Sequence, residues 1–206
     1  MNRIMTTDTF EQASSMSLPI ALDVHSVLLT DEQFYQLCRD NRDLRLELTA
    51  QGELIIMPPT GSLTGWRNAK IIYRLTAWAE IDATGLSFAS STGFKLPNGA
   101  KRSPDAAWIK LDRWQALNKK EQEGLAPVCP DFVVELRSPD DNLSTLQEKM
   151  AEYIENGARL GWLIDPKAKR VYVYRPGQTV ESLENPETVS GDPVLPAFVL
   201  SLKEIW

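Results

Sequence analysis

Two acidic residues lie in apolar stretches of the sequence, where a carboxylate needs a metal ion, a cation or hydrogen bonds to satisfy it. Asp105 belongs to the run 103–109, which reads as a short strand, and Glu135 lies in the run 132–136, which reads as a buried strand. Mg²⁺ prefers oxygen ligands and usually keeps several waters, so carboxylates on two neighbouring strands can hold it. The pair therefore predicts a metal-assisted hydrolytic site.

Three further groups could complete such a site. Glu47 sits in Leu46-Glu47-Leu48, and its carboxylate is a candidate third ligand. The carbonyl of Leu136 follows Glu135 directly and is a candidate oxygen ligand. Lys149 lies on the helix expected after the Glu135 strand, where it could point back at the sheet edge. The plainer alternatives are an exposed strand residue beside Arg45 for Glu47 and a solvated helix residue for Lys149.

These residue types suit the hydrolysis of a phosphodiester. A bound metal ion lowers the pKa of its water and neutralises charge that develops on phosphate. A nearby lysine can orient that water or stabilise the transition state. Arg137 could clamp a phosphate, or it could pair with Asp140 or Asp141.

Composition narrows the class of protein. The chain has 206 residues, enough for one domain with a core, and a net charge of −6. Residues 61–120 nevertheless hold ten Lys/Arg and four Asp/Glu, net +6. This segment could face a phosphate backbone, or its basic residues could belong to solvated helix faces. A single histidine argues against a histidine-rich zinc site or a Ser-His-Asp triad.

The compartment can also be inferred. Cys38 and Cys129 lack metal-type spacing, so we expect free thiols in a reducing cytoplasm. No apolar run is long enough to span a bilayer, and the polar N-terminus does not resemble a signal peptide. We therefore expect a cytoplasmic protein without a membrane segment.

The patterns of the sequence predict one α/β domain over residues 19–206 with a mixed sheet, preceded by a mobile segment, 1–18. Capping boxes at Thr30 and Ser144 predict helices that end near residues 40 and 156, and a third helix is expected over 63–83. The runs 44–48 and 54–57 predict a hairpin, and 160–165 and 170–175 predict another. The large aromatic side chains are expected in the core, namely Trp66, Trp78, Trp108, Trp162 and Tyr153.

The order of these elements, together with several short motifs, resembles the Uma-two family of bacterial endonucleases over about residues 20–206. The motifs are Leu46-Glu47-Leu48, Met57-Pro58-Pro59-Thr60-Gly61, Ser103-Pro104-Asp105, the run 130–139 around Glu135, and Tyr153-Ile154-Glu155-Asn156-Gly157. The resemblance implies a PD-(D/E)xK fold, which is a restriction-endonuclease-like mixed sheet flanked by helices. It also implies an acidic metal site made by Glu47, Asp105 and Glu135.

One position departs from the superfamily pattern. That pattern places a lysine two residues after the glutamate, where this chain has Arg137. Arginine stays protonated and cannot act as a general base. Relatives often supply the lysine from the following helix, which implies Lys149 here, with Gln147 as another polar candidate.

The resemblance implies an endonuclease that uses Mg²⁺, or Mn²⁺ in its place, to cut DNA. Two alternatives remain: an inactive nucleic-acid-binding or regulatory protein on the same fold, and a nuclease that acts on RNA or nucleotides. A homodimer is expected because cutting two strands needs two sites. Residues 171–174 could form its contact or belong to the sheet core.

Overall fold

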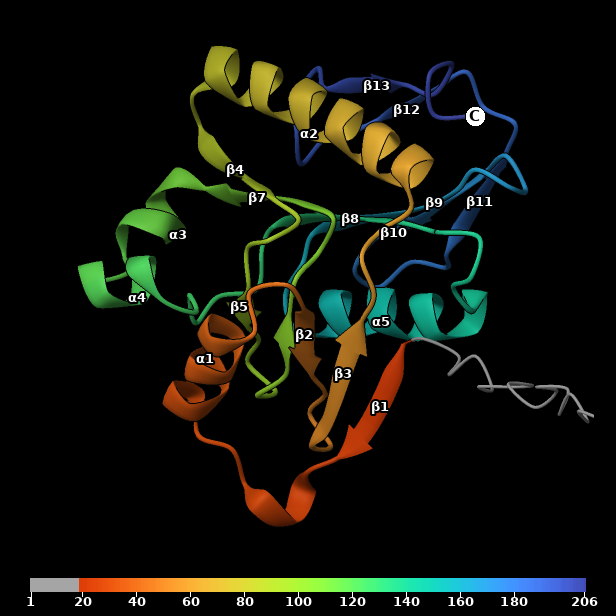
Figure 1. The fold of residues 1–206 in the computed structure, drawn as a ribbon. Helices are drawn as coiled ribbons and strands as arrows, with labels where there is room; N and C mark the ends of the chain where they lie inside the picture. Colours follow the sequence, from red (N-terminus) through yellow and green to blue (C-terminus); the bar gives the residue numbers. More distant parts are fainter. Residues whose placement is uncertain (1–18) are drawn as a thin grey trace, which may run out of the picture.

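The computed structural model describes residues 19–206, so the expected mobile segment 1–18 lies outside the described residues. A six-stranded sheet forms the centre (Figure 1). Only β8 and β9 pair in parallel, which confirms the predicted mixed sheet. In spatial order the strands are β11 (Glu181–Glu184), β10 (Arg170–Tyr174), β9 (Leu160–Asp165), β8 (Phe132–Leu136), β7 (Ala106–Lys110) and β4 (Gly85–Ala89).

Helices cover this sheet on both faces, α2 (Ser62–Asp82) on one and α5 (Leu143–Glu155) on the other (Figure 1). Strands buried on both faces read as near-continuous apolar runs, as β8 and β9 do. Alternate residues of β8 face opposite helices: Val134 packs in the core with α2, and Val133 packs in the core with α5. Glu135, two residues from Val133, therefore faces α5.

A second, antiparallel sheet lies beside the first (Figure 1). Its order is β1 (Ile20–Asp23), β3 (Glu53–Met57), β2 (Arg45–Leu48), β6 (Lys101–Arg102) and β5 (Phe94–Lys95). The predicted hairpin is its β2–β3 pair. Helix α1 (Asp31–Asp40) packs Phe34 into a small core with this sheet. The sequence predicted one sheet, but the structure divides the strands among three.

The remaining elements connect or cap these layers. They are η1 (His25–Val27), α3 (Leu111–Gln115), α4 (Lys119–Glu123), and the two-stranded sheet of β12 (Thr188–Ser190) and β13 (Val199–Ser201). Within residues 19–206, no helix is long and apolar enough to cross a membrane.

Two local expectations are corrected, and one open alternative is decided. The side chain of Asn142, not Ser144, caps α5 by accepting a hydrogen bond from the Ser144 amide at 2.9 Å. Trp66 lies on the outside of α2 with 48% of its surface exposed, whereas Trp108, Trp162 and Tyr153 are buried. Of the two alternatives for residues 171–174, their burial in the sheet favours the sheet core.

Candidate active site

Asp105 is held next to β8 by main-chain contacts. It lies immediately before β7, and its amide donates to the carbonyl of Val134 at 2.9 Å. Its Oδ2 accepts a hydrogen bond from the amide of Leu136 at 2.8 Å. Asp105 is therefore fixed beside the strand segment that carries Glu135, as the sequence predicted. The Ser103-Pro104 segment before it joins β6 of one sheet to β7 of the other.

Glu135 points from β8 towards α5 and is buried with 3% of its surface exposed. The ammonium group of Lys149 lies 2.8 Å from Glu135 Oε1, and the hydroxyl of Tyr153 donates to the same oxygen at 3.1 Å. Lys149 and Tyr153 are four residues apart, so they share one face of α5. The prediction that Lys149 points back at the sheet is confirmed.

Glu47 reaches the same lysine from the second sheet. Its Oε1 lies 2.9 Å from Lys149 Nζ and accepts the amide of Ser103 at 2.9 Å, while Oε2 lies 3.2 Å from an Nη atom of Arg102. Glu47 is buried, so the interpretation as an exposed strand residue is wrong. Lys149 thus bridges two carboxylates that come from different sheets.

The pKa values of the two glutamates are shifted in opposite directions. Burial raises the pKa of Glu47, but attraction to Lys149, Arg102 and Arg45 outweighs it and lowers that pKa to about 2. Burial also raises the pKa of Glu135, and Lys149 offsets only part of this while Asp105 and Glu47 add to it, so the pKa rises to about 7. Burial lowers the pKa of Lys149, but Glu135 and Glu47 outweigh this and raise it.

Two arginines that the sequence reasoning did not select belong to the site. An Nη atom of Arg45 lies 2.9 Å from Asp105 Oδ1, and another donates to the carbonyl of Ser103. Arg102 Nε lies 2.6 Å from Glu152 of α5. Strand periodicity could have found Arg45, because it stands two residues before Glu47 on the same face of β2.

Arg137 is directed elsewhere. An Nη atom lies 2.6 Å from Asp165 Oδ2, and its Nε donates to the carbonyl of Asp141 at 3.2 Å. Its ion-pair partner is therefore Asp165 and not Asp140 or the Asp141 carboxylate. Gln147 makes no side-chain hydrogen bond to the described residues, so the structure does not bring it into the site.

The oxygen donors at Asp105 and Glu135 suit a hard divalent cation. Mg²⁺ commonly uses only one or two protein carboxylates and keeps waters in its other positions. The protein contacts of Glu135 all fall on Oε1, so within residues 19–206 no group donates to Oε2. Both oxygens of Asp105 and both oxygens of Glu47 are engaged by basic side chains and main-chain amides. In the described chain no group of three or more His, Cys, Asp or Glu side chains is arranged to hold a metal.

Comparison with known proteins identifies the family. The model of the Uma2 family, described as "Putative restriction endonuclease", matches residues 31–203. A solved structure described as a putative nuclease belonging to DUF820, from Anabaena variabilis ATCC 29413, superimposes with a TM-score of 0.67. It shares 21% identity and covers 78% of this chain and 88% of its own, which shows a common fold. No curated protein matches the chain. Because the family model spans most of the sequence, the chain belongs to the Uma2 family of restriction-endonuclease-like proteins.

Proposed function

We propose that this nuclease-family protein is a Mg²⁺-dependent endonuclease that hydrolyses phosphodiester bonds in DNA. The observation that carries the proposal is the group formed by partly buried Asp105 and buried Glu135 and Lys149, in which carboxylates and a cation come from three segments of the chain. Buried charges of this kind are expensive for stability, and perturbed pKa values cluster at functional sites. The family membership and the fold support a nuclease, and the donor set supports the metal.

Asp105 and Glu135 would hold the cation, with the Leu136 carbonyl as a further oxygen ligand. When bound, Mg²⁺ supplies a water of lowered pKa and neutralises charge on the scissile phosphate. Mn²⁺ takes the same oxygen ligands and should substitute. Glu47 remains a candidate third ligand. Asp105 would have to share or release Arg45 or the Leu136 amide to bind the cation, and Glu47 would have to share or release Lys149, Arg102 or the Ser103 amide.

Lys149 is the proposed catalytic cation. Its ammonium group lies against Glu135 Oε1, so it can donate a hydrogen bond to the attacking water or to a phosphate oxygen beside the carboxylates. Glu47 positions Lys149 from the opposite side. Arg137 is engaged by Asp165, so a role for it in phosphate binding requires that ion pair to open.

The test is cleavage of supercoiled plasmid DNA at low salt with Mg²⁺ or Mn²⁺. Glu135→Gln should lower the rate on the order of 10²–10³-fold, the scale for removing one preorganised charge-stabilising group. Glu155→Gln is the matched control, because Glu155 is exposed on α5 and outside the site. Equal cleavage by wild type and Glu135→Gln would overturn the site assignment.

The same assay separates the alternatives. Cleavage of RNA or nucleotides with intact plasmid would replace the DNA substrate. Metal binding without hydrolysis of any of these substrates would identify an inactive nucleic-acid-binding or regulatory protein. Cleavage that persists in a chelating agent would remove the metal from the proposal. A homodimer is proposed only for duplex cutting, and sedimentation with and without DNA tests it.

A further inference from the structure

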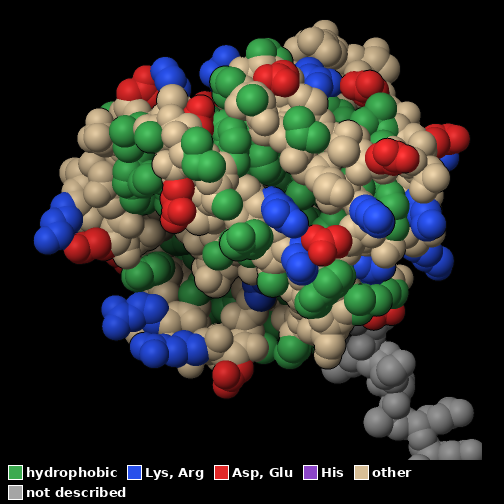
Figure 2. All heavy atoms as spheres, turned by 90° about the horizontal axis from the view of Figure 1, so that it is seen from above, with side chains coloured by type: hydrophobic (Ala, Val, Ile, Leu, Met, Phe, Trp, Pro, Cys, Tyr) green, Lys and Arg blue, Asp and Glu red, His purple; other side chains and the backbone are tan. Residues whose placement is uncertain are grey.

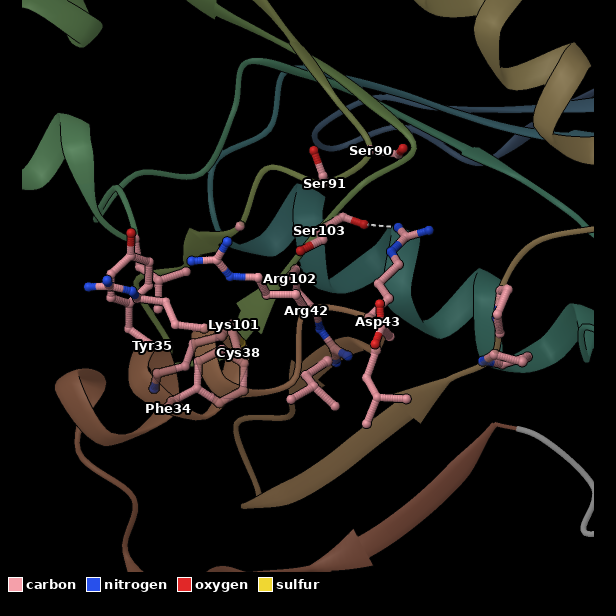
Figure 3. Close-up of a pocket in the computed structure, with 18 of the residues that line it drawn as sticks. Phe34, Tyr35, Cys38, Arg42, Asp43, Ser90, Ser91, Lys101, Arg102 and Ser103 are labelled. Carbon is pink, nitrogen blue, oxygen red and sulfur yellow. Dashed lines mark hydrogen bonds between the residues drawn. The ribbon is translucent and has the colours of Figure 1, made fainter.

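A pocket of about 620 Å³ opens beside the candidate active site (Figure 3). Helix α1, the start of β2, β6 and the segments after β3 and β4 line it. The serines of the segment after β4, Ser90 and Ser91, lie across the pocket from α1 (Figure 3). Its volume falls in the range of pockets that enclose one small molecule.

The lining of this pocket is rich in basic side chains, although Lys101 is paired with Asp31 and Arg45 and Arg102 are paired with carboxylates of the active site. Its cationic side chains outnumber its single acidic one, Asp43, and they are Arg39, Arg42, Arg45, Lys101 and Arg102. Arg39 and Arg42 are exposed and have no ion pair with any described residue. On the face shown in Figure 2, Lys and Arg side chains lie among acidic and hydrophobic ones. A concave site with one sign of charge attracts an anion of opposite sign.

The pocket is joined to the active site by shared residues. Arg45 lines the pocket while one of its Nη atoms binds Asp105, and Arg102 lines it while binding Glu47. The Nε of Arg45 is buried without any hydrogen-bond partner among the described residues. A buried donor of this kind is costly unless an acceptor reaches it. An anion bound in the pocket to Arg45 or Arg102 would therefore be separated from the active-site carboxylates only by that arginine side chain.

One wall of the pocket can accept a flat ring. Tyr35 on α1 is 37% exposed, and its hydroxyl donates to the carbonyl of Glu123 at 3.3 Å, which restrains the ring. Aromatic rings stack on nucleobases without regard to sequence. Cationic and aromatic groups together fit a phosphate with its attached nucleoside. A paired base, by contrast, would bring its partner strand into the same limited volume.

We propose that this pocket binds one unpaired nucleotide of the DNA strand, next to the bond that is cut. The inference rests on the proposed function, because it names the form of the substrate for the same site. Arg42 and Arg39 contact phosphate, Arg45 links the bound phosphate to Asp105, and Tyr35 stacks on the base. The protein should therefore prefer single-stranded or frayed DNA to continuous duplex.

The test measures the binding of a short fluorescent DNA strand. A chelating agent is present throughout, so that no metal-dependent cleavage occurs. The strand is compared with its own duplex by fluorescence anisotropy. Arg42→Glu should weaken single-strand binding at least roughly tenfold and lower its salt dependence. Tyr35→Ala should weaken it roughly tenfold at unchanged salt dependence.

Two controls match these variants. Lys203→Glu makes the same charge reversal at an exposed lysine of the C-terminal segment, and Tyr73→Ala removes an exposed ring on α2 that is outside the pocket. Both should bind like wild type. Equal affinity for strand and duplex, or losses in the controls as large as in the pocket variants, would overturn the proposal.

The binding assay also distinguishes failure of the pocket from failure of the nuclease. Pocket-dependent binding of the single strand by a protein that cleaves nothing would support the pocket and refute the proposed hydrolysis. Metal-dependent cleavage with binding that is unaffected by Arg42→Glu and Tyr35→Ala would support the nuclease and refute the pocket.

Discussion

Each of the two sheets supplies one glutamate that contacts Lys149, but the surroundings of the two glutamates shift their pKa values in opposite directions. Glu47 from the five-stranded sheet is surrounded by Lys149, Arg102 and the Ser103 amide, and its pKa is lowered to about 2. Glu135 from the six-stranded sheet lies among apolar strand residues near other carboxylates, and its pKa is raised to about 7. Environment rather than residue type therefore engages both oxygens of Glu47 and leaves Glu135 Oε2 without a donor among residues 19–206.

Removing the shared lysine should have the largest effect on stability. Lys149→Met leaves two buried carboxylates without their common cation, and breaking a buried ion pair in this way costs about 3–5 kcal/mol. Urea unfolding at pH 7 measures the loss. The deficit should shrink as the pH falls, because protonation of Glu135 removes one uncompensated charge. A Lys149→Met protein as stable as Lys203→Met would contradict the buried ion pairs.

Glu47→Gln tests how much the surrounding cations stabilise the Glu47 carboxylate. The folded-state pKa of Glu47, about 2, lies below its ordinary value of 4.5, so its carboxylate stabilises the fold above pH 4.5. This contribution is lost as the pH falls through about 2. Glu47→Gln should therefore be less stable than wild type at pH 7 by about 3 kcal/mol, with the gap closing in acid. A gap that does not change with pH would show that packing, not charge, is responsible.

Glu135→Gln should change the stability at neutral and alkaline pH in the opposite direction to Glu47→Gln. The folded-state pKa of Glu135, about 7, lies above its ordinary value of 4.5, so the fold loses stability as the pH rises from 4.5 to 7. In a chelating agent at pH 8, the glutamine variant should be more stable than wild type by about 1–3 kcal/mol. Thermal unfolding at pH 4 and pH 8 checks this. Destabilisation at both values would mean that Lys149 dominates the environment of Glu135.

Arg137→Lys is the smallest change and shows which element supplies the cation of the site. It restores the lysine of the superfamily pattern at a side chain that binds Asp165. Because Lys149 already occupies the site, plasmid cleavage should stay within about threefold of wild type, with stability lowered by about 1 kcal/mol or less. A large gain in activity would instead place the catalytic cation at position 137, directly after β8.

Periodicity and capping predicted the local elements well. Thr30 and Gln33 form the expected capping box, and β8 and β9 follow their apolar runs. The sequence also suggested Asp105, Glu135 and Lys149 as a group, because an acidic residue in an apolar strand is conspicuous. What it could not show was how the strands divide among sheets, since pairing between distant segments leaves little local signal.

The same limit explains the site residues that were missed or misjudged. In the sequence, Arg45 and Arg102 look like ordinary surface residues. Only the fold brings Arg45 against Asp105 and Arg102 against Glu47. Trp66 was expected in the core because its spacing fits a helical stripe, but the buried face of α2 follows Ile71, Leu75 and Ala79 instead. Long-range contacts decide these cases, and they require the folded chain.

The docking of two sheets around Lys149 has a consequence for biosynthesis. The site joins Arg45 and Glu47 to Glu135, Lys149 and Tyr153, so a chain still on the ribosome lacks part of it until α5 has emerged and packed. Under the proposed function, a chain truncated before α5 lacks Lys149 and cannot hydrolyse its substrate.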